Sequence, residues 1–77
     1  MTPAEFADTC HTLGLTNGDV ALITGNTTRA VQYWLTGKND IPQSVAILLN
    51  GMAAGRIDMD WVADEVSRIT AAQAAHA

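Results

Sequence analysis

Residues 21–34, with the sequence ALITGNTTRAVQYW, predict two short helices joined by a sharp turn. The chain reverses at Gly25, where a positive φ is expected because glycine adopts that conformation without steric cost. The small Ala21 lets the two helices approach each other closely. Val31 and Trp34 lie three residues apart, so both side chains point from the second helix into the core. The segment therefore predicts a helix-turn-helix unit.

The other side chains of that second helix are left facing outward, and they are short and polar. They are Thr27, Thr28, Arg29, Gln32 and Tyr33. Hydrogen-bonding groups on one helix face suit the recognition of base edges in a DNA major groove.

The sequence before this unit predicts a first helix over residues 3–13. Thr2 is a good N-cap, and Glu5 stands three residues further on, as in a capping box. Gly14 ends the helix in a left-handed conformation. Its apolar stripe consists of Phe6, Cys10 and Leu13.

Two further caps bound the helices of the central unit. Thr16 and Asp19 repeat the capping pattern at the start of the second helix. The third helix is expected over residues 27–36, with Asn26 as its cap. Pro42 then opens a fourth helix, whose near-continuous apolar run predicts a central position. That run contains Val45, Ile47, Leu48, Leu49 and Met52.

A fifth helix is predicted over residues 57–72, capped by Asp58, and the Ala-rich residues 71–77 are expected to be weakly restrained. Its apolar residues recur at 3-4-3 spacing, like one seam of a short coiled coil. The seam consists of Met59, Val62, Val66 and Ile69. Two interpretations remain open, because the seam can pack on the chain's own core or on a second subunit. Trp61 lies off the seam and can extend either contact.

Size and composition favour one domain over residues 1–77, with an all-α fold built as a compact bundle of four to five helices. Apolar residues make up 48% of the chain, which is too much for a disordered protein. No apolar run approaches the roughly 20 residues that span a bilayer. No signal peptide is visible, so a cytoplasmic protein is expected. Cys10 is the single cysteine, so no internal disulfide forms and a buried thiol is predicted.

The net charge of −4 argues against a protein that binds DNA through bulk electrostatics. The charge is unevenly distributed, however. Residues 1–25 carry no Lys or Arg, and residues 44–77 carry a net charge of −2. Residues 26–43 contain Arg29, Lys38 and Asp40, so they form the one segment with a net positive charge.

Residues 2–52 resemble the helix-turn-helix domains of the Cro/C1 type (XRE family), the lambda repressor-like class of phage and mobile-element repressors. The matching features are Leu13-Gly14-Leu15-Thr16, the spacing from Ala21 to Gly25, Val31 with Trp34, Gly37-Lys38 and Ile41-Pro42. The resemblance implies a transcriptional regulator, a repressor that binds an inverted-repeat operator in double-stranded DNA as a homodimer. Residues 57–72 would then be a possible dimerisation element.

The resemblance also assigns roles by position. The helix that begins near Asn17 presents its N-terminus to a phosphate. Arg29 is placed to bond guanine, and Gln32 is placed to bond adenine. Thr27, Thr28 and Tyr33 approach bases or backbone, and Lys38 contacts a phosphate, which positions the protein without specifying sequence.

Several positions depart from that family's pattern. Thr24 and Asn26 stand where apolar residues usually pack under the turn, and Leu35 replaces a residue that is often polar. Leu22 and Ile23 then fall on the outer side, unless a small rotation of the helix buries Ile23. Exposed apolar residues on an acidic domain predict a protein interface.

A second hypothesis follows from these departures: a protein-protein interaction module, an adaptor or anti-activator that does not bind DNA. It would hold its partner through Leu22, Ile23, Leu35 or the last helix. A third possibility is a domain that binds both DNA and a protein.

No catalytic constellation is present, so an enzyme is not expected. The soft metal ligands are limited to Cys10, His11 and His76, and neither a metal nor a cofactor is predicted. The acidic residues of the last helix suit a helix N-terminus. They are Asp58, Asp60, Asp64 and Glu65.

Overall fold

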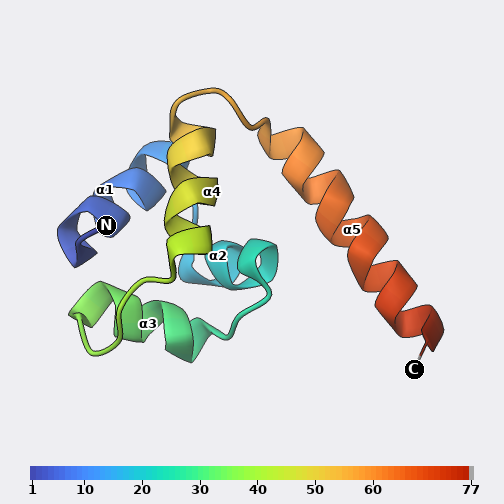
Figure 1. Ribbon diagram of the computed structural model, residues 1–77, viewed down its shortest axis with the longest axis horizontal. Coiled ribbons are helices and arrows are strands. Elements are labelled where there is room, and N and C mark those ends of the chain that lie inside the picture. The colour runs from blue at the N-terminus through green and yellow to red at the C-terminus, as the bar shows by residue number, and fades with distance from the viewer. Residues whose placement is uncertain (77) are drawn as a thin grey trace.

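The computed structural model describes residues 1–76, and within this range the chain forms five α-helices and no strand (Figure 1). The all-α prediction is therefore confirmed. The helices are α1 (Pro3–Leu13), α2 (Asn17–Thr24), α3 (Thr28–Thr36), α4 (Gln43–Ala53) and α5 (Met59–His76). No helix among the described residues is long and apolar enough to cross a bilayer.

Reciprocal side-chain caps start α1 and α2, as the sequence predicts. At α1 the Glu5 amide donates to Thr2 Oγ1 over 3.1 Å, and the Thr2 amide donates to Glu5 Oε1 over 3.0 Å. Thr16 and Asp19 repeat these bonds at α2. Hydrogen bonds from the backbone amides of Thr2 and Thr16 lower the pKa of the Glu5 and Asp19 carboxyls.

The core lies among α1 to α4 and the start of α5. Phe6 of α1 and Trp34 of α3 meet edge to face, with ring centroids 5.9 Å apart. Cys10 is buried beside them, as expected, and burial raises the pKa of its thiol. The buried residues are Phe6, Cys10, Val20, Ala21, Val31, Trp34, Val45, Leu49, Met52 and Val62.

The turn between α2 and α3 has the predicted geometry. Gly25 ends α2 with φ 68°, and the Asn26 amide donates back to the Ala21 carbonyl over 2.9 Å. This 6→1 bond is the signature of a Schellman cap, which satisfies a carbonyl that the helix end would leave free. Ala21 is buried where the two helices pack, so its small side chain sits where the sequence places it.

Helix α4 differs in two respects from its prediction. It begins at Gln43 with Pro42 as the preceding cap residue, one position later than expected. Its apolar run is not wholly central, because Ile47 is 61% exposed while Val45, Leu49 and Met52 are buried. A helix packs one face against its neighbours, so some residues of a continuous apolar run remain exposed to solvent.

The connection from α4 to α5 is held tightly against the end of α4. The carbonyl of Gly51 accepts hydrogen bonds from the amides of Arg56 and Ile57, over 2.9 and 3.1 Å. A Cβ at Gly51 would lie 2.6 Å from Cδ1 of Ile57, so a larger residue here would require the Ile57 side chain to move. This turn sets the direction in which α5 leaves the core.

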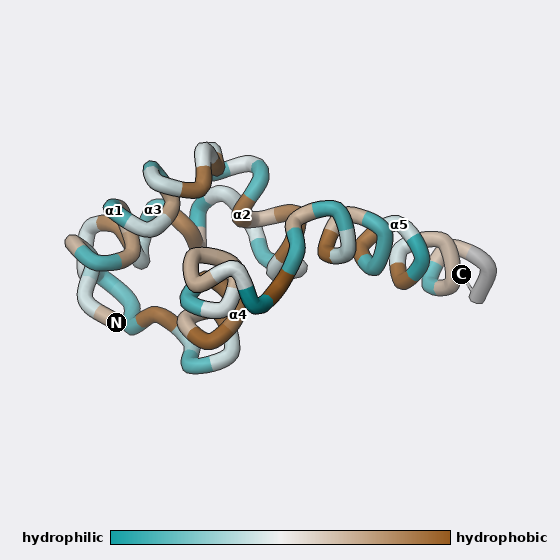
Figure 2. Tube along the Cα trace, turned by 90° about the horizontal axis from the view of Figure 1, so that it is seen from above, coloured by the Kyte–Doolittle hydropathy of each residue, from teal (hydrophilic) through white to brown (hydrophobic). Residues whose placement is uncertain are grey.

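Helix α5 begins at Met59 and runs to His76, so the predicted range of residues 57–72 is wrong at both ends. Asp58 accepts a hydrogen bond from the Asp60 amide, as its predicted capping role requires. Beyond its first turns the helix extends away from the other four as an arm (Figures 1 and 2). Every residue from Ser67 to Ala74 is exposed.

The seam of α5 is divided by this arrangement. Val62 is buried, and Met59 and Val66 pack against the same core, whereas Ile69 is 48% exposed. The chain's own core therefore uses the first three seam residues. Val62 in particular is not left on the surface for a second subunit to contact.

We expect the substitution Gly25→Ala to lower the free energy of unfolding by about 1–2 kcal/mol, because an L-residue is strained at this positive φ. A Cβ there would meet no atom within 4 Å, so the cost is conformational and not steric. Gly25→Asn should cost less, since asparagine tolerates the left-handed region.

Gly18→Ala is the matched control for this comparison. Gly18 is helical, and its added Cβ would meet only Thr16 Oγ1 at 3.7 Å, an ordinary contact. Denaturant unfolding gives the free energy of unfolding of all three variants. Equal stability of Gly25→Ala and the wild type would contradict the role given to this turn.

Candidate functional site

Helix α3 presents a polar outer face while its inner face is locked into the core. Val31 and Trp34 are buried, and Ala30 packs beside them. Thr28, Arg29 and Gln32 are exposed. The predicted polar outer side is present at these residues, but Tyr33, which was also expected to face outward, is half-buried.

The start of α3 corrects one prediction. Thr27, not Asn26, is the N-cap: its Oγ1 accepts a hydrogen bond from the Ala30 amide over 3.1 Å. The helix consequently begins at Thr28 and not at Thr27. The Thr27 hydroxyl keeps its hydrogen free to donate, so it remains able to meet a phosphate at the helix end.

Asn26 instead completes the end of α2. Its Nδ2 donates to the carbonyl and to Oγ1 of Thr24, over 3.0 and 3.1 Å. The Thr24 hydroxyl donates in turn to the Val20 carbonyl over 2.7 Å. These two polar residues bond each other and the last turn of α2, so the turn does not need apolar side chains at these positions.

The end of α3 brings together two residues that the sequence keeps apart. Gly37 takes a left-handed conformation, and the Asn39 amide donates to the Tyr33 carbonyl over 3.3 Å. Lys38 Nζ then lies 4.4 Å from the centre of the Tyr33 ring, a cation–π contact. Tyr33 is half-buried, so the contact holds the Lys38 ammonium at this end of α3. This contact was not predicted from the sequence, and its one local signal is Gly37, where the chain turns back.

The N-terminus of α2 carries two free amides and one negative charge. The Thr16 amide donates to the Asp19 carboxylate, and the Asp19 amide donates to the Thr16 hydroxyl. The amides of Asn17 and Gly18 have no hydrogen-bond partner within residues 1–76. Asn17 is exposed. The two amides can meet an anion, although the Asp19 carboxylate at the same helix end opposes its charge.

The cations near α3 have no acidic partners among the described residues. The single ion pair in this part of the chain joins Arg68 to Glu65 on α5. Arg29 and Lys38 therefore keep their full charge toward solvent. Helix α3 itself lies on the side of the molecule away from the α5 arm (Figures 1 and 2).

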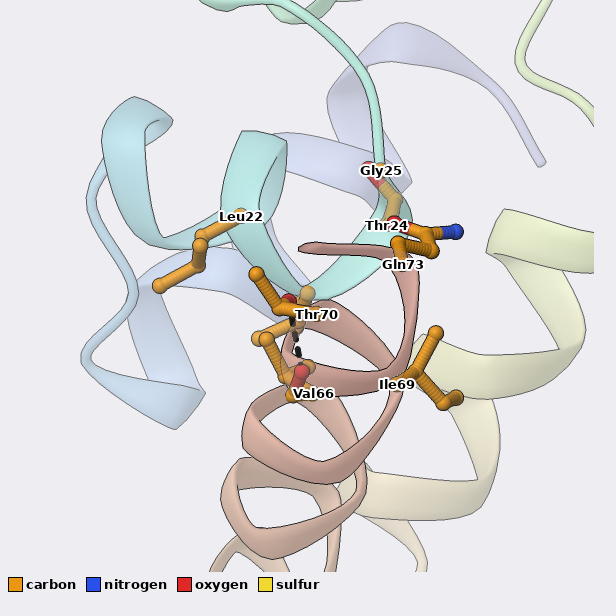
Figure 3. Close-up of a pocket in the computed structure, with 8 residues that line it drawn as sticks. Leu22, Thr24, Gly25, Val66, Ile69, Thr70 and Gln73 are labelled. Atoms are coloured by element: carbon orange, nitrogen blue, oxygen red, sulfur yellow. Dashed lines mark hydrogen bonds between the residues drawn. The ribbon is translucent and has the colours of Figure 1, made fainter. Parts of the chain in front are cut away.

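The apolar residues expected on the surface behave differently from one another. Leu22 is 65% exposed, while Ile23 and Leu35 are half-buried against the core. Leu22 and Ile23 line a groove between α2 and α5 that also includes Val66 and Ile69 (Figure 3). The groove continues toward α1, where its walls include Leu13, Leu15, Met59 and Ala63.

No cluster of metal-binding side chains is present among the described residues. His11 is exposed. No family model, curated protein or solved structure matches the chain. The resemblance to Cro/C1-type domains thus rests on the sequence motifs, and the site is defined by its own geometry.

The cap assignment predicts different effects for two neighbouring threonines. Thr27→Ala should lower the free energy of unfolding by about 1 kcal/mol, because the Ala30 amide loses its partner. Thr28→Ala should change it by less than about 0.5 kcal/mol, since Thr28 is exposed. Thermal or denaturant unfolding compares the two. A larger loss for Thr28→Ala than for Thr27→Ala would overturn the assignment.

Proposed function

We propose that this protein is a sequence-specific DNA-binding transcriptional regulator, a repressor of the phage or mobile-element type. The observation that carries the proposal is the outer face of α3, on a helix whose other face is buried. It offers Arg29, exposed and without an acidic partner among residues 1–76, and the exposed Gln32. A helix about 10–12 Å across fits a major groove about 12 Å wide.

Direct recognition of bases would come from two long side chains. Arg29 forms a pair of hydrogen bonds with guanine O6 and N7, and Gln32 forms a pair with adenine N6 and N7. Thr28, at the first turn of α3, reaches a thymine methyl or a phosphate. The buried Val31 and Trp34 keep α3 from rotating, so these side chains approach the bases in one orientation.

Contacts to the DNA backbone would frame these base contacts. The free amides of Asn17 and Gly18 meet one phosphate at the start of α2. Lys38, held beside Tyr33, meets another at the end of α3. Thr27 donates its hydroxyl to a third. These contacts set the position of α3 on the duplex but do not select a sequence.

The small number of cations limits non-specific binding. Lys38 is the one cation assigned to a phosphate in each subunit, so affinity should fall less steeply with salt than for a basic repressor. With a net charge of −4, sequence recognition would depend on hydrogen bonds to bases more than on bulk electrostatics. A dimer would place two α3 helices in successive major grooves and occlude a promoter.

A second function is favoured by the exposed Leu22 and the groove between α2 and α5. In that case the domain is an adaptor or anti-activator that holds a protein partner. Retention on random duplex DNA at low salt separates the two. Retention supports the regulator, whereas its absence together with a defined protein complex supports the adaptor.

Operator binding tests the role of α3 directly. Duplexes selected from a random pool give a consensus, and titration on it should show that Arg29→Ala and Gln32→Ala each cost about 1–3 kcal/mol, confined to particular base pairs. Lys38→Ala should weaken binding to all sequences and reduce the salt slope by about 1.

Arg56→Ala is the control for these substitutions, because Arg56 is an exposed arginine in the connection between α4 and α5. We expect it to bind the selected duplex like the wild type. If Arg29→Ala and Gln32→Ala also bind like the wild type, α3 is not the reading helix.

A further inference from the structure

Helix α5 carries a second stripe, which is separate from its apolar seam. Its residues are Trp61, Glu65, Arg68 and Ala72, at 4-3-4 spacing. Trp61, Glu65 and Arg68 each stand one position before a seam residue, namely Val62, Val66 and Ile69. Because one residue turns an α-helix by about 100°, the stripe and the seam occupy different sides of α5.

Trp61, Arg68 and Ala72 lie at the surface, while Met59, Val62 and Val66 of the seam pack against the core. Trp61 is 57% exposed, unlike Trp34, which is buried. The Arg68 side chain is 71% exposed, Ala72 is exposed and Glu65 is half-buried. A large aromatic side chain left this open on a single chain is the kind of residue that anchors protein interfaces.

The order of residues along the stripe is self-complementary. In an antiparallel pair of α5 helices centred between Val66 and Ser67, position 61 faces position 72 and position 65 faces position 68. The bulky Trp61 then meets the small Ala72, and the acidic Glu65 meets the basic Arg68. Two-fold symmetry makes each of these contacts occur twice.

We propose that two copies of this chain pair through these stripes, with their α5 helices antiparallel. Trp61 of one protomer packs over Ala72 of the partner subunit, and Glu65 pairs with Arg68 of the partner subunit. The seam cannot supply the same contact, because Val62 is buried in the chain's own core and Met59 and Val66 pack against it.

The two kinds of contact have different tasks. The tryptophans supply the apolar area that leaves water when the copies meet. The charges contribute little affinity at an exposed position, but they fix direction and register, since a parallel or shifted pair would set like charges together. The ion pair between Glu65 and Arg68 within one helix already holds both groups on the same side of α5.

This pairing deepens the proposed function, because it names the surface that would join two α3 helices on one operator. Its test uses no DNA, so failure of the pairing is distinguishable from failure of DNA binding. The full chain is examined by sedimentation equilibrium over a range of concentrations. We expect a reversible dimer, and we expect Trp61→Ala to weaken it by about tenfold or more.

Leu22→Ala is the matched control, because Leu22 is as exposed as Trp61 but lines the groove between α2 and α5. It should leave the dimer constant unchanged. Circular dichroism confirms that each variant keeps its helices. An effect of Leu22→Ala that exceeds that of Trp61→Ala would place the second copy in the groove and overturn the proposal.

A mixing experiment tests the charge register without relying on Trp61. Glu65→Arg alone makes the stripe doubly basic, and Arg68→Glu alone makes it doubly acidic. Each variant by itself sets like charges opposite each other, so it should dimerise more weakly than the wild type. An equimolar mixture should form heterodimers, because each charge then faces its opposite across the interface. Repair of the ion pair within one helix cannot explain this result, since mixing restores none.

Two results would overturn the pairing. A wild-type chain that stays monomeric at every concentration reached contradicts it, whatever other partner the stripe then binds. Equal dimerisation of both charge variants, alone and mixed, also contradicts it, because the stripe would then not lie in the interface.

Discussion

Trp34 reaches from α3 to Phe6 of α1, where the two buried rings meet edge to face with centroids 5.9 Å apart. Val31 fills the core one turn earlier in the same helix. Together these contacts fix the rotation of α3 about its own axis. In that rotation Arg29 and Gln32 stand outside, so the chemistry offered to a partner depends on a contact made on the opposite side of the helix.

Polar residues complete the frame that the core begins. Thr16 with Asp19, Thr24 with Asn26, and Thr27 with the Ala30 amide satisfy backbone groups at the ends of α2 and α3. These bonds use neutral groups or an acid, and none uses a lysine or arginine. Within residues 1–76, Arg29 and Lys38 are thus left without an acidic partner, which suits contacts to a second molecule in a protein with a net charge of −4.

Much of the fold and part of the candidate site follow from local chemistry. The caps at Thr2 and Thr16 and the left-handed Gly25 were predictable because each depends on residues within one turn. The cap of α3 was misplaced because Asn26 and Thr27 are both good N-caps, and Asn26 is already bound to Thr24. The Lys38 contact with Tyr33 was not predicted, since it depends on the path of the chain after Gly37.

The sequence by itself determined five helices, their polar and apolar sides and the sharp turn at Gly25, because these depend on spacing and on neighbours in the chain. It determined which residues of α5 share a side, but not which side meets the core. The tertiary structure decided that, through the tight return of Ile57 onto Gly51. That return fixes the side of α5 that meets the core, so Val62 is buried and Trp61 is exposed. A helix packed on one side of a core can bury only one of its stripes.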